Sequence, residues 1–370
     1  MALQPFALER YFARHEFRAR HLLGSSDPES LSVAELLALE PEREDDLKRL
    51  WLGYTESAGA PELRRDIAAQ YRTIQPDQVL VFTGAEEPIF AFMHAVLEPG
   101  DHLIVHQPSY QSHHSVAVSR GIAVTPWWGR PERGWAPDLE ELAALLRPET
   151  KALLVCTPHN PTGYLFDPEA WLALVEFARA HGLWIFSDEV YRGAEHDPAD
   201  RLPAMADLYE RGLSLHCLSK SYGLAGLRLG WIATRDDEAL QKLAAFKDYL
   251  TICNSAPSEL LGGIAVRHGE ALFARTRERL VANLELLEAC FRRHPARFRW
   301  ERPRAGTTTF PALVGEDPLA FCEELVEETG IMLVPSTFFD LPGAYLRFGY
   351  GRASLPEVLP LLEAWLRTRP

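Results

Sequence analysis

The sequence lacks several features that would assign it to a membrane, a secretory route or a metal. No uncharged apolar run reaches the length that spans a bilayer, and the N-terminal MALQPFALERYFARHEF lacks the apolar stretch and cleavage site of a signal peptide. The five cysteines form no C-x-x-C pair, and the histidines, the His113-His114 pair included, do not have zinc-ligand spacing. We therefore expect free buried thiols, no metal and a cytoplasmic location.

Positive charge is also scarce. Lys and Arg total 38 against 52 Asp and Glu, which gives a formal net charge of −14. Nucleic acids and membrane surfaces attract cations, so this balance argues against either partner. The 370 residues, 47% of them hydrophobic, are enough to bury a substantial core, as two domains or as one large domain with an appendage.

Short apolar runs alternate with helical patterns through the middle of the chain. Helix-start signals stand between the runs, such as Asp138 with Glu141 and the pair Asp167-Pro168. The runs are apolar on both faces, as buried parallel strands are. This alternation predicts an α/β fold with a parallel sheet and helices on both faces. The predicted strands are residues 79–82, 102–105, 152–155, 183–186, 214–217 and 231–233.

The alternation of strand and helix patterns ends after about residue 236. A long helical stretch from roughly Pro257 to Arg293 follows, and then a smaller α+β segment. We predict a large α/β domain at residues 45–260 and a small C-terminal domain at 261–370 that includes the interdomain helix, with the N-terminal segment 1–44 joined to the latter. The strands and helix starts expected in the small domain are Trp300, Thr307–Phe310, Met332–Val334, Tyr345–Phe348, Asp317-Pro318 and Ser354 with Glu357.

Polar side chains follow three of the predicted strands. Asn160 stands in TPHNPTG after strand 152–155, and Asp188 and Tyr191 stand in SDEVY after strand 183–186. Lys220 stands in CLSKSYGLAGLRLGW after strand 214–217. Taken singly, Asn160 is typical of a turn, Asp188 of a helix cap and Lys220 of a solvated lysine. Taken together at three strand ends, they favour one ligand-binding crevice.

These motifs carry a family resemblance. The run Ser219 to Arg228 matches S-K-x-x-G-L-x-G-L-R, and with N-P-T-G and S-D-E-V-Y it makes the chain, from about Leu52 to Arg347, resemble the class I/II aminotransferases of the fold-type I superfamily that binds pyridoxal 5′-phosphate (PLP). The resemblance implies a mostly parallel seven-stranded sheet and PLP as cofactor. The runs PSYQSH, GWAPDLEEL, FKDYLT and RAGTTTFPAL are similar to the capreomycidine synthase-like branch, whose members act on arginine-derived amino acids.

The resemblance implies roles for the residues around the cofactor ring. Lys220 is expected to form the Schiff base with PLP and then to act as general base, so burial and a neighbouring cation should lower its pKa from about 10.4. Asp188 is expected to pair with the pyridine nitrogen, Asn160 and Tyr191 to hydrogen-bond the phenolic oxygen, and Tyr110 to stack on the ring.

The phosphate of PLP needs donors and positive charge. The resemblance assigns it Arg228, the Ser219 hydroxyl and the backbone N–H groups of the turn Gly84-Ala85-Glu86 at the start of a helix predicted over 86–96. Tyr54 matches the tyrosine that reaches the phosphate of a neighbouring subunit, which implies a homodimer. Cys217 stands where a hydroxyl is common, and the Glu86 side chain is expected to point away from the anion.

Only a few residues are predicted to bind the substrate. Arg347 in YLRFGYG matches the arginine that binds the substrate α-carboxylate, with Arg352 as a nearby alternative. The run Ser25-Ser26-Asp27, with Glu29, either faces a cationic substrate side chain or caps the helix that begins at LSVAELL.

The resemblance implies an aminotransferase that exchanges the amino group between an amino acid and a 2-oxo acid. PLP enzymes also perform elimination and cyclisation, so a cyclase or dehydratase on an arginine-derived amino acid, or a C–S lyase, is the alternative. A third hypothesis is that the chain is a PLP-binding regulator of transcription. It requires a DNA-binding module ahead of the core, where this chain has only about 45 residues and an acidic net charge.

Overall fold

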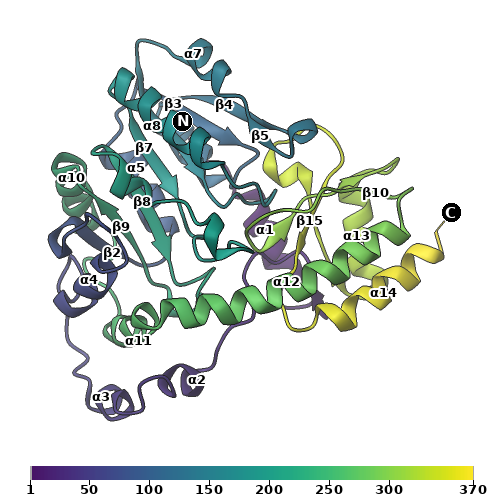
Figure 1. The fold of residues 1–370 in the computed structure, drawn as a ribbon, viewed down its shortest axis with the longest axis horizontal. Helices are drawn as coiled ribbons and strands as arrows, with labels where there is room; N and C mark the ends of the chain where they lie inside the picture. The colour runs from purple at the N-terminus through teal and green to yellow at the C-terminus, as the bar shows by residue number, and fades with distance from the viewer. Residues whose placement is uncertain (1, 370) are drawn as a thin grey trace.

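The computed structural model describes residues 2–369, and its centre is an eight-stranded sheet in the order β2-β9-β8-β7-β6-β3-β4-β5 (Figure 1). Strand β9 runs antiparallel to both of its neighbours and β5 antiparallel to β4, whereas the other adjacent pairs are parallel. The strands are β2 (Val79–Phe82), β3 (His102–Gln107), β4 (Ala123–Arg130), β5 (Ala136–Pro137), β6 (Thr150–Cys156), β7 (Trp184–Asp188), β8 (Gly212–Cys217) and β9 (Gly230–Thr234).

The mostly parallel sheet confirms the predicted fold class, with two differences. The sequence did not identify β4, because only Trp127 and Gly129 of that strand are buried and it therefore lacks the continuous apolar pattern of its neighbours. The expected seven-stranded sheet has an eighth member, β5, whose two residues pair only with the end of β4.

Helices cover both faces of the sheet, as the alternation of strands and helices predicted. One apolar cluster joins strand residues to α5, α6 and α10, a second joins the opposite face to α7, α8 and α9, and a third joins β2 and β9 to α2, α4 and α11. The helices are α1 (Ala7–His15), α2 (Val33–Leu37), α3 (Arg43–Arg49), α4 (Pro61–Ala68), α5 (Glu86–Ala95), α6 (Ser112–Ser119), α7 (Leu142–Leu145), α8 (Pro168–His181), α9 (Met205–Leu208), α10 (Asp237–Lys247), α11 (Ala256–Arg267), α12 (Gly269–Arg293), α13 (Pro318–Thr329) and α14 (Leu355–Arg367).

The predicted long helix is two helices, α11 and α12, which are separated at His268. Helix α12 runs from the edge of the sheet to the C-terminal elements (Figure 1). There, short strands form small sheets in the orders β10-β12 and β11-β15-β14. The strands of this region are β10 (Phe298–Arg299), β11 (Thr308–Thr309), β12 (Ala312–Leu313), β13 (Ile331–Met332), β14 (Val334–Pro335) and β15 (Leu346–Gly349), of which β13 pairs with the N-terminal segment. The domain bounds given above stay a prediction.

The N-terminal segment lies against the C-terminal elements. Strand β1 (His21–Leu22) pairs in parallel with β13. The hydroxyl of Tyr11, a buried residue of α1, donates to the carbonyl of Leu333 at 3.1 Å. These contacts fix the residues that follow β1 at the edge of the large sheet.

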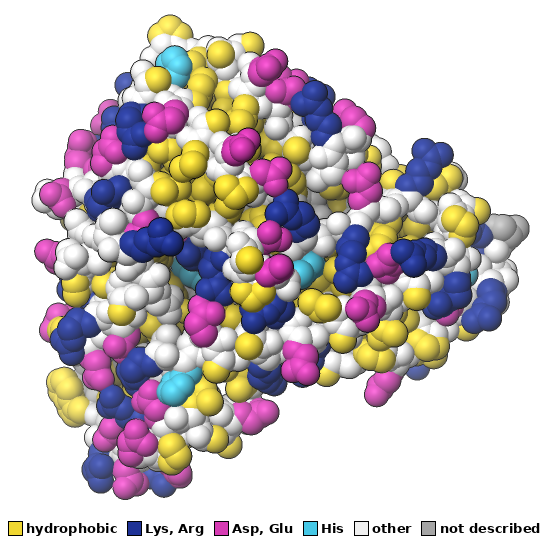
Figure 2. Space-filling model, viewed as in Figure 1, with side chains coloured by type: hydrophobic (Ala, Val, Ile, Leu, Met, Phe, Trp, Pro, Cys, Tyr) yellow, Lys and Arg dark blue, Asp and Glu magenta, His cyan; other side chains and the backbone are white. Residues whose placement is uncertain are grey.

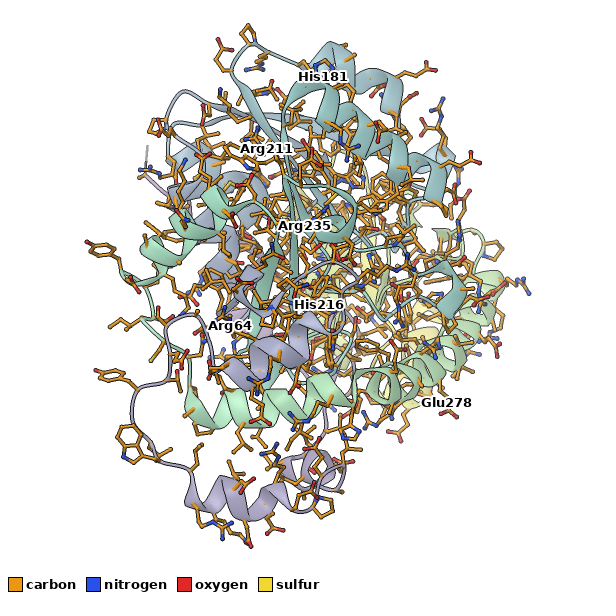
Figure 3. The ribbon with its side chains drawn as sticks, turned by 60° about the vertical axis from the view of Figure 1, so that its left-hand side comes forward. Arg64, His181, Arg211, His216, Arg235 and Glu278 are labelled. Atoms are coloured by element: carbon orange, nitrogen blue, oxygen red, sulfur yellow. The ribbon has the colours of Figure 1, made fainter. Side chains whose placement is uncertain are left out.

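The surface mixes charged and apolar side chains (Figure 2), and the interior contains some polar ones. On the face drawn in Figure 2, acidic and basic side chains are interspersed. His216 lies in the interior on β8, whereas Glu278 projects outward from α12 (Figure 3). Within residues 2–369, none of the helices has the length and apolar character needed to cross a bilayer.

The helix caps expected from sequence form in part. Asp317 caps α13 by accepting from the N–H of Ala320 at 2.8 Å. Asp138 instead begins a short 3-10 turn by accepting from the N–H of Glu140, and Ser354 makes no side-chain cap bond at α14. The two capping boxes predicted at Asp138 and Ser354 were therefore wrong.

We expect the substitution Asp317→Ala to lower the free energy of unfolding by about 1 kcal/mol, because the Ala320 N–H loses its acceptor. Denaturant titration measures this change. Asp317→Asn, which keeps an acceptor oxygen, is the matched control. An equal loss in both variants would show that the cap does not stabilise α13.

Candidate active site

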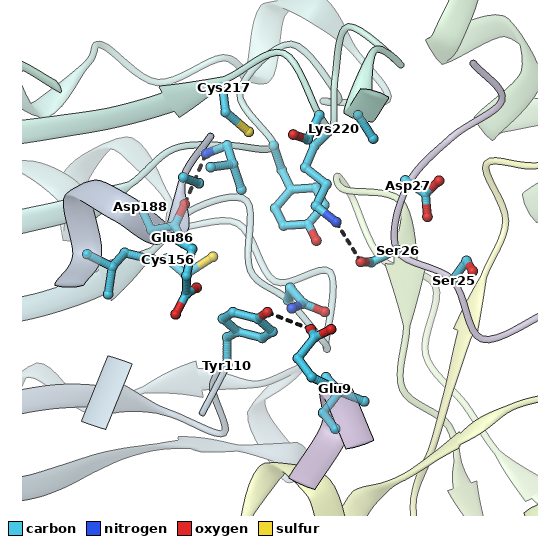
Figure 4. Close-up of a pocket in the computed structure, with 18 of the residues that line it drawn as sticks. Glu9, Ser25, Ser26, Asp27, Glu86, Tyr110, Cys156, Asp188, Cys217 and Lys220 are labelled. Carbon is cyan, nitrogen blue, oxygen red and sulfur yellow. Dashed lines mark hydrogen bonds between the residues drawn. The ribbon is translucent and has the colours of Figure 1, made fainter. Parts of the chain in front are cut away.

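A cavity of about 510 Å³ opens at the carboxyl ends of β6, β7 and β8 (Figure 4). Cys156, Asp188 and Cys217 are the last residues of these three strands, and all three line the cavity. Its other walls come from α1, from residues 25–27 and from the start of α5. Doubly wound folds bind their ligands in a crevice at this edge of the sheet.

The cavity brings together most of the site residues that the sequence predicted. Gly84 lies beside it, where a Cβ would come within 2.6 Å of Nη2 of Arg228. Tyr54 lies outside it and is 83% exposed. The predicted residues that line the cavity are Ala85, Glu86, Tyr110, Asn160, Asp188, Tyr191, Ser219, Lys220, Arg228 and Arg347.

The amino group of Lys220 lies inside the cavity. Its Nζ donates to Oγ of Ser26 at 2.8 Å and lies 5.8 Å from the centre of the Tyr191 ring. Burial is the largest single effect and lowers the pKa of Lys220, but Tyr191, Asp27 and Cys217 together raise it by more, so the net pKa is raised. The expected lowering of this pKa by the protein was wrong, because acidic neighbours outweigh both burial and the cation Arg347.

Asp188 is held by a residue that the sequence analysis set aside. Its Oδ2 lies 3.0 Å from Nε2 of His113, and its Oδ1 accepts from the N–H of Val190 at 3.2 Å. His113 is almost fully buried in the first turn of α6. No local pattern in the sequence relates His113 to Asp188, because the two residues are 75 positions apart.

One end of the cavity is built for an anion. Ala85 and Glu86, at the start of α5, line this end, and the free N–H groups of a helix start favour an anion. Beside them, Nη1 of Arg228 donates to Oγ of Ser219 at 3.3 Å. Cys217 also lines the cavity, and burial raises the pKa of its thiol, so it remains an uncharged weak donor there.

The side chain of Glu86 does not point away from the site. Its carboxyl lies in the cavity on the side of Tyr110 (Figure 4). Glu86 is exposed to the open cavity, yet desolvation by the protein packed around it raises the pKa of its carboxyl to about 7; His113 and Ser112 lower this pKa, and Glu9 and Asp188 raise it. The expectation that only its backbone N–H would face the cavity was therefore wrong, because α5 turns this side chain inward.

Arg347 is a buried cation with one unused donor. It is 1% exposed, and burial lowers the pKa of its guanidinium. Its Nε donates to the carbonyl of Gly24 at 3.0 Å and its Nη1 to Oδ1 of Asn160 at 3.2 Å, whereas Nη2 has no protein partner among residues 2–369. Arg352, the alternative, instead pairs with Asp27 and does not line the cavity.

Part of the N-terminal segment enters the cavity. Ser26 and Asp27 line it, and the cap of α2 is Ser32, which forms a capping box with Glu35. The run at residues 25–27 therefore faces the cavity and does not cap the helix. Helix α1 adds a carboxylate that the sequence analysis did not identify, because Glu9 accepts from the hydroxyl of Tyr110 at 2.7 Å (Figure 4).

The cavity fits PLP on chemical grounds. It has a donor-rich end for a phosphate, a buried carboxylate that can pair with a pyridinium nitrogen, and a lysine amine for an aldehyde. Arg347 adds an unused guanidinium donor for a carboxylate. Fold and cavity together define a fold-type I PLP-dependent enzyme.

The chain belongs to the aminotransferase class I and II family, whose sequence profile matches residues 22–362. PLP is therefore its cofactor. The chain is 32% identical to capreomycidine synthase from Streptomyces vinaceus over 342 residues, which cover 91% of this chain and 87% of that protein. It is also 38% identical over 188 residues to an arginine–pyruvate transaminase from Pseudomonas aeruginosa, covering 48% of this chain and 47% of that one.

Solved structures agree with this assignment. A PLP-dependent aminotransferase from Streptococcus suis superposes with a TM-score of 0.94 and 32% identity, over 100% of this chain and 99% of that one. The PLP-dependent cyclase OrfR superposes with a TM-score of 0.90 and 29% identity, over the same shares of both chains. The family thus includes similar proteins named for different reactions.

The raised pKa of Glu86 predicts a pH-dependent effect on stability. The folded chain disfavours the ionised form of Glu86. Glu86 therefore lowers the free energy of unfolding as the pH rises from the ordinary pKa of a glutamate, about 4.3, to the pKa in the folded chain, about 7. The neutral Glu86→Gln should therefore gain thermal stability relative to the parent between about pH 5 and about pH 8 in cofactor-free protein. Thermal melts of both proteins at the two pH values measure this gain. A difference in melting temperature between variant and parent that is the same at both pH values would contradict the prediction.

Proposed function

We propose that the protein is a PLP-dependent aminotransferase that moves the amino group of a cationic amino acid to a 2-oxo acid. The observation that carries the proposal is that Lys220, Asp188 and Arg347 converge on one cavity from three separate parts of the fold. The bound cofactor supplies an electron sink for the substrate Cα.

The chain's own residues have complementary tasks around the cofactor. Arg228, Ser219 and the N–H groups at the start of α5 would hold the phosphate. Asp188, oriented by His113, would bind the ring nitrogen and keep a proton there, and Tyr110 would cover the ring.

Other residues hold and activate the substrate. The free Nη2 of Arg347 would bind the α-carboxylate, and Asn160, already bonded to Arg347, would reach the phenolic oxygen together with Tyr191. Lys220 would bind the cofactor's aldehyde before substrate arrives. Once displaced, its amine would take the proton from the substrate Cα and later return it.

The acidic wall of the cavity supports a cationic side chain. Glu9, Glu16 and Asp27 all line the cavity, and Asp27 already pairs with Arg352. Burial raises the pKa of Glu16, and the neighbouring carboxylates of Asp27 and Glu9 raise it further. A guanidinium or ammonium group placed between these acids would relieve their mutual repulsion. The arginine–pyruvate transaminase named above is a relative whose name specifies such a donor.

Cyclisation is the second candidate, favoured by one observation. Capreomycidine synthase matches almost the whole chain, and the cyclase OrfR shares its fold throughout. Nothing in the motif from Ser219 to Arg228 distinguishes the two outcomes, because both begin with loss of the Cα proton.

A half-reaction separates the candidates. We expect the PLP-loaded enzyme, mixed with arginine or its hydroxylated relatives and no 2-oxo acid, to convert its cofactor absorbance stably to the amine form and release one 2-oxo acid per site. Absorbance and product analysis measure this. Ammonia release, or a cyclic product with the cofactor spectrum restored, would replace transamination with the second candidate.

The lysine itself is tested by Lys220→Ala. We expect this variant to lose the adduct that borohydride fixes between cofactor and protein, and to lose at least about 10³-fold in turnover, because it lacks both the attachment point and the base. Mass spectrometry of the reduced protein and steady-state kinetics measure these losses. Lys242→Ala, on the surface of α10, is the control. Retained turnover in Lys220→Ala would end the proposal.

We further propose a homodimer in which Tyr54 reaches the phosphate of the partner's cofactor. Supporting this, Tyr54 lies outside its own cavity and belongs to a set of large apolar side chains exposed near the segment 50–56. Exposed apolar clusters mark protein interfaces. The members of this set are Trp51, Leu52, Tyr54, Tyr249 and Ile252.

Tyr54→Phe should keep the dimer and raise the dissociation constant of PLP about tenfold, because a hydrogen bond to a charged oxygen is lost. Light scattering gives the mass and a cofactor titration gives the affinity. A monomeric parent, or an unchanged PLP affinity, would contradict this arrangement.

A further inference from the structure

Ser26 places a hydroxyl directly on the reactive amine. Nζ of Lys220 donates to Oγ of Ser26 at 2.8 Å, a contact drawn in Figure 4. Ser26 belongs to the stretch between β1 and α2, 194 positions from Lys220, and lies in none of the motifs that identify the family. Its hydroxyl has one proton to donate and two lone pairs to accept, so it can serve two partners at once.

The position of Ser26 is fixed by the chain on both sides of it. The carbonyl of Leu23 accepts from the N–H of Gly349 at 2.7 Å, and the carbonyl of Ser26 itself accepts from Oγ1 of Thr307 at 2.6 Å. Next to it, the Asp27 carboxylate pairs with Arg352. The hydroxyl therefore has a defined location and does not depend on a mobile loop.

Ser26 also contacts the second residue that faces Lys220. A hydrogen bond with the Ser26 side chain lowers the pKa of the Tyr191 phenol, although burial raises it more. The hydroxyl that accepts from the lysine amine is thus also a neighbour of the phenol. Asp27 and Glu16 lie within electrostatic reach of the amine and attract it. The Ser26 hydroxyl is a neutral acceptor, so it can hold the amine by a hydrogen bond without forming an ion pair with it.

We propose that Ser26 is a positioning residue that holds the amino group of Lys220 whenever this amine is not joined to the cofactor. A lysine has about 2 kcal/mol of rotamer entropy, so a free amine without an anchor spends less time beside the substrate Cα. When Nζ takes the Cα proton it becomes an ammonium, which donates to Oγ of Ser26 until the proton returns. This inference rests on the proposed role of Lys220.

The test uses Ser26→Ala, which removes the hydroxyl, and Ser26→Thr, which keeps it. Ser30→Ala, at an exposed position of the same stretch outside the cavity, is the control. With a Cα-deuterated donor, we expect Ser26→Ala to lower kcat about fivefold, to leave KM nearly unchanged and to raise the isotope effect on kcat, because the proton transfer alone becomes slower.

A second readout does not depend on turnover. In enzyme loaded with pyridoxamine phosphate the Lys220 amine is free, and its rate of acetylation at fixed pH is followed by mass spectrometry. We expect Ser26→Ala to raise this rate about fivefold, because the ammonium loses an acceptor, and Ser26→Thr to stay near the parent. Parent-like values in Ser26→Ala for both readouts, or a threonine variant equal to the alanine variant, would overturn the inference.

The experiments distinguish a wrong role for Ser26 from a wrong role for Lys220. If borohydride fixes no adduct on Lys220 of the parent, the role of this lysine is wrong, and the inference about Ser26 falls with it. If the parent forms the adduct and Ser26→Ala matches the parent in isotope effect and acetylation rate, the positioning role alone is wrong.

Discussion

The parallel register of β6, β7 and β8 is the constraint on which the site depends. Cys156 of β6 pairs with Asp188 of β7, and Asp188 pairs with Leu215, two residues before the end of β8. The loops that follow these strands therefore deliver Asn160, Tyr191 and Lys220 to one place. Each strand is buried on both faces, which fixes its register because a slip of one residue would exchange the two apolar faces. Core packing on the sheet therefore determines the geometry at its edge.

Charge is distributed unequally within the cavity. Arg347 is buried and donates to two neutral acceptors, a carbonyl and an amide oxygen, while its Nη2 has no protein partner among residues 2–369, which favours a carboxylate. The wall that carries Glu9, Glu16 and Asp27 has an excess of negative charge. An amino acid with a cationic side chain would present complementary charges to both regions, which is the electrostatic basis of the proposed substrate class.

The sequence predicted what local patterns encode. Buried strands have continuous apolar runs, and Asn160, Asp188 and Lys220 follow them immediately, so strand ends and site residues were found together. It missed β4, which is half-exposed, and it misjudged the pKa of Lys220 and the direction of the Glu86 side chain. These depend on neighbours that are distant along the chain. Likewise, the contact of Ser26 with Lys220 joins residues that no local pattern relates.

In the proposed mechanism, the stretch from Leu23 to Asp27 would link recognition of the substrate to placement of the base. Within five consecutive residues it accepts hydrogen bonds from Arg347, Lys220 and Arg352. A substrate that engages Arg347 or the acidic wall therefore acts on the same piece of chain that holds the lysine amine. Similar proteins of one family are named as a transaminase and as a synthase, so the shared cofactor residues do not decide the reaction. A segment that sets the position of the base is where that decision can be made.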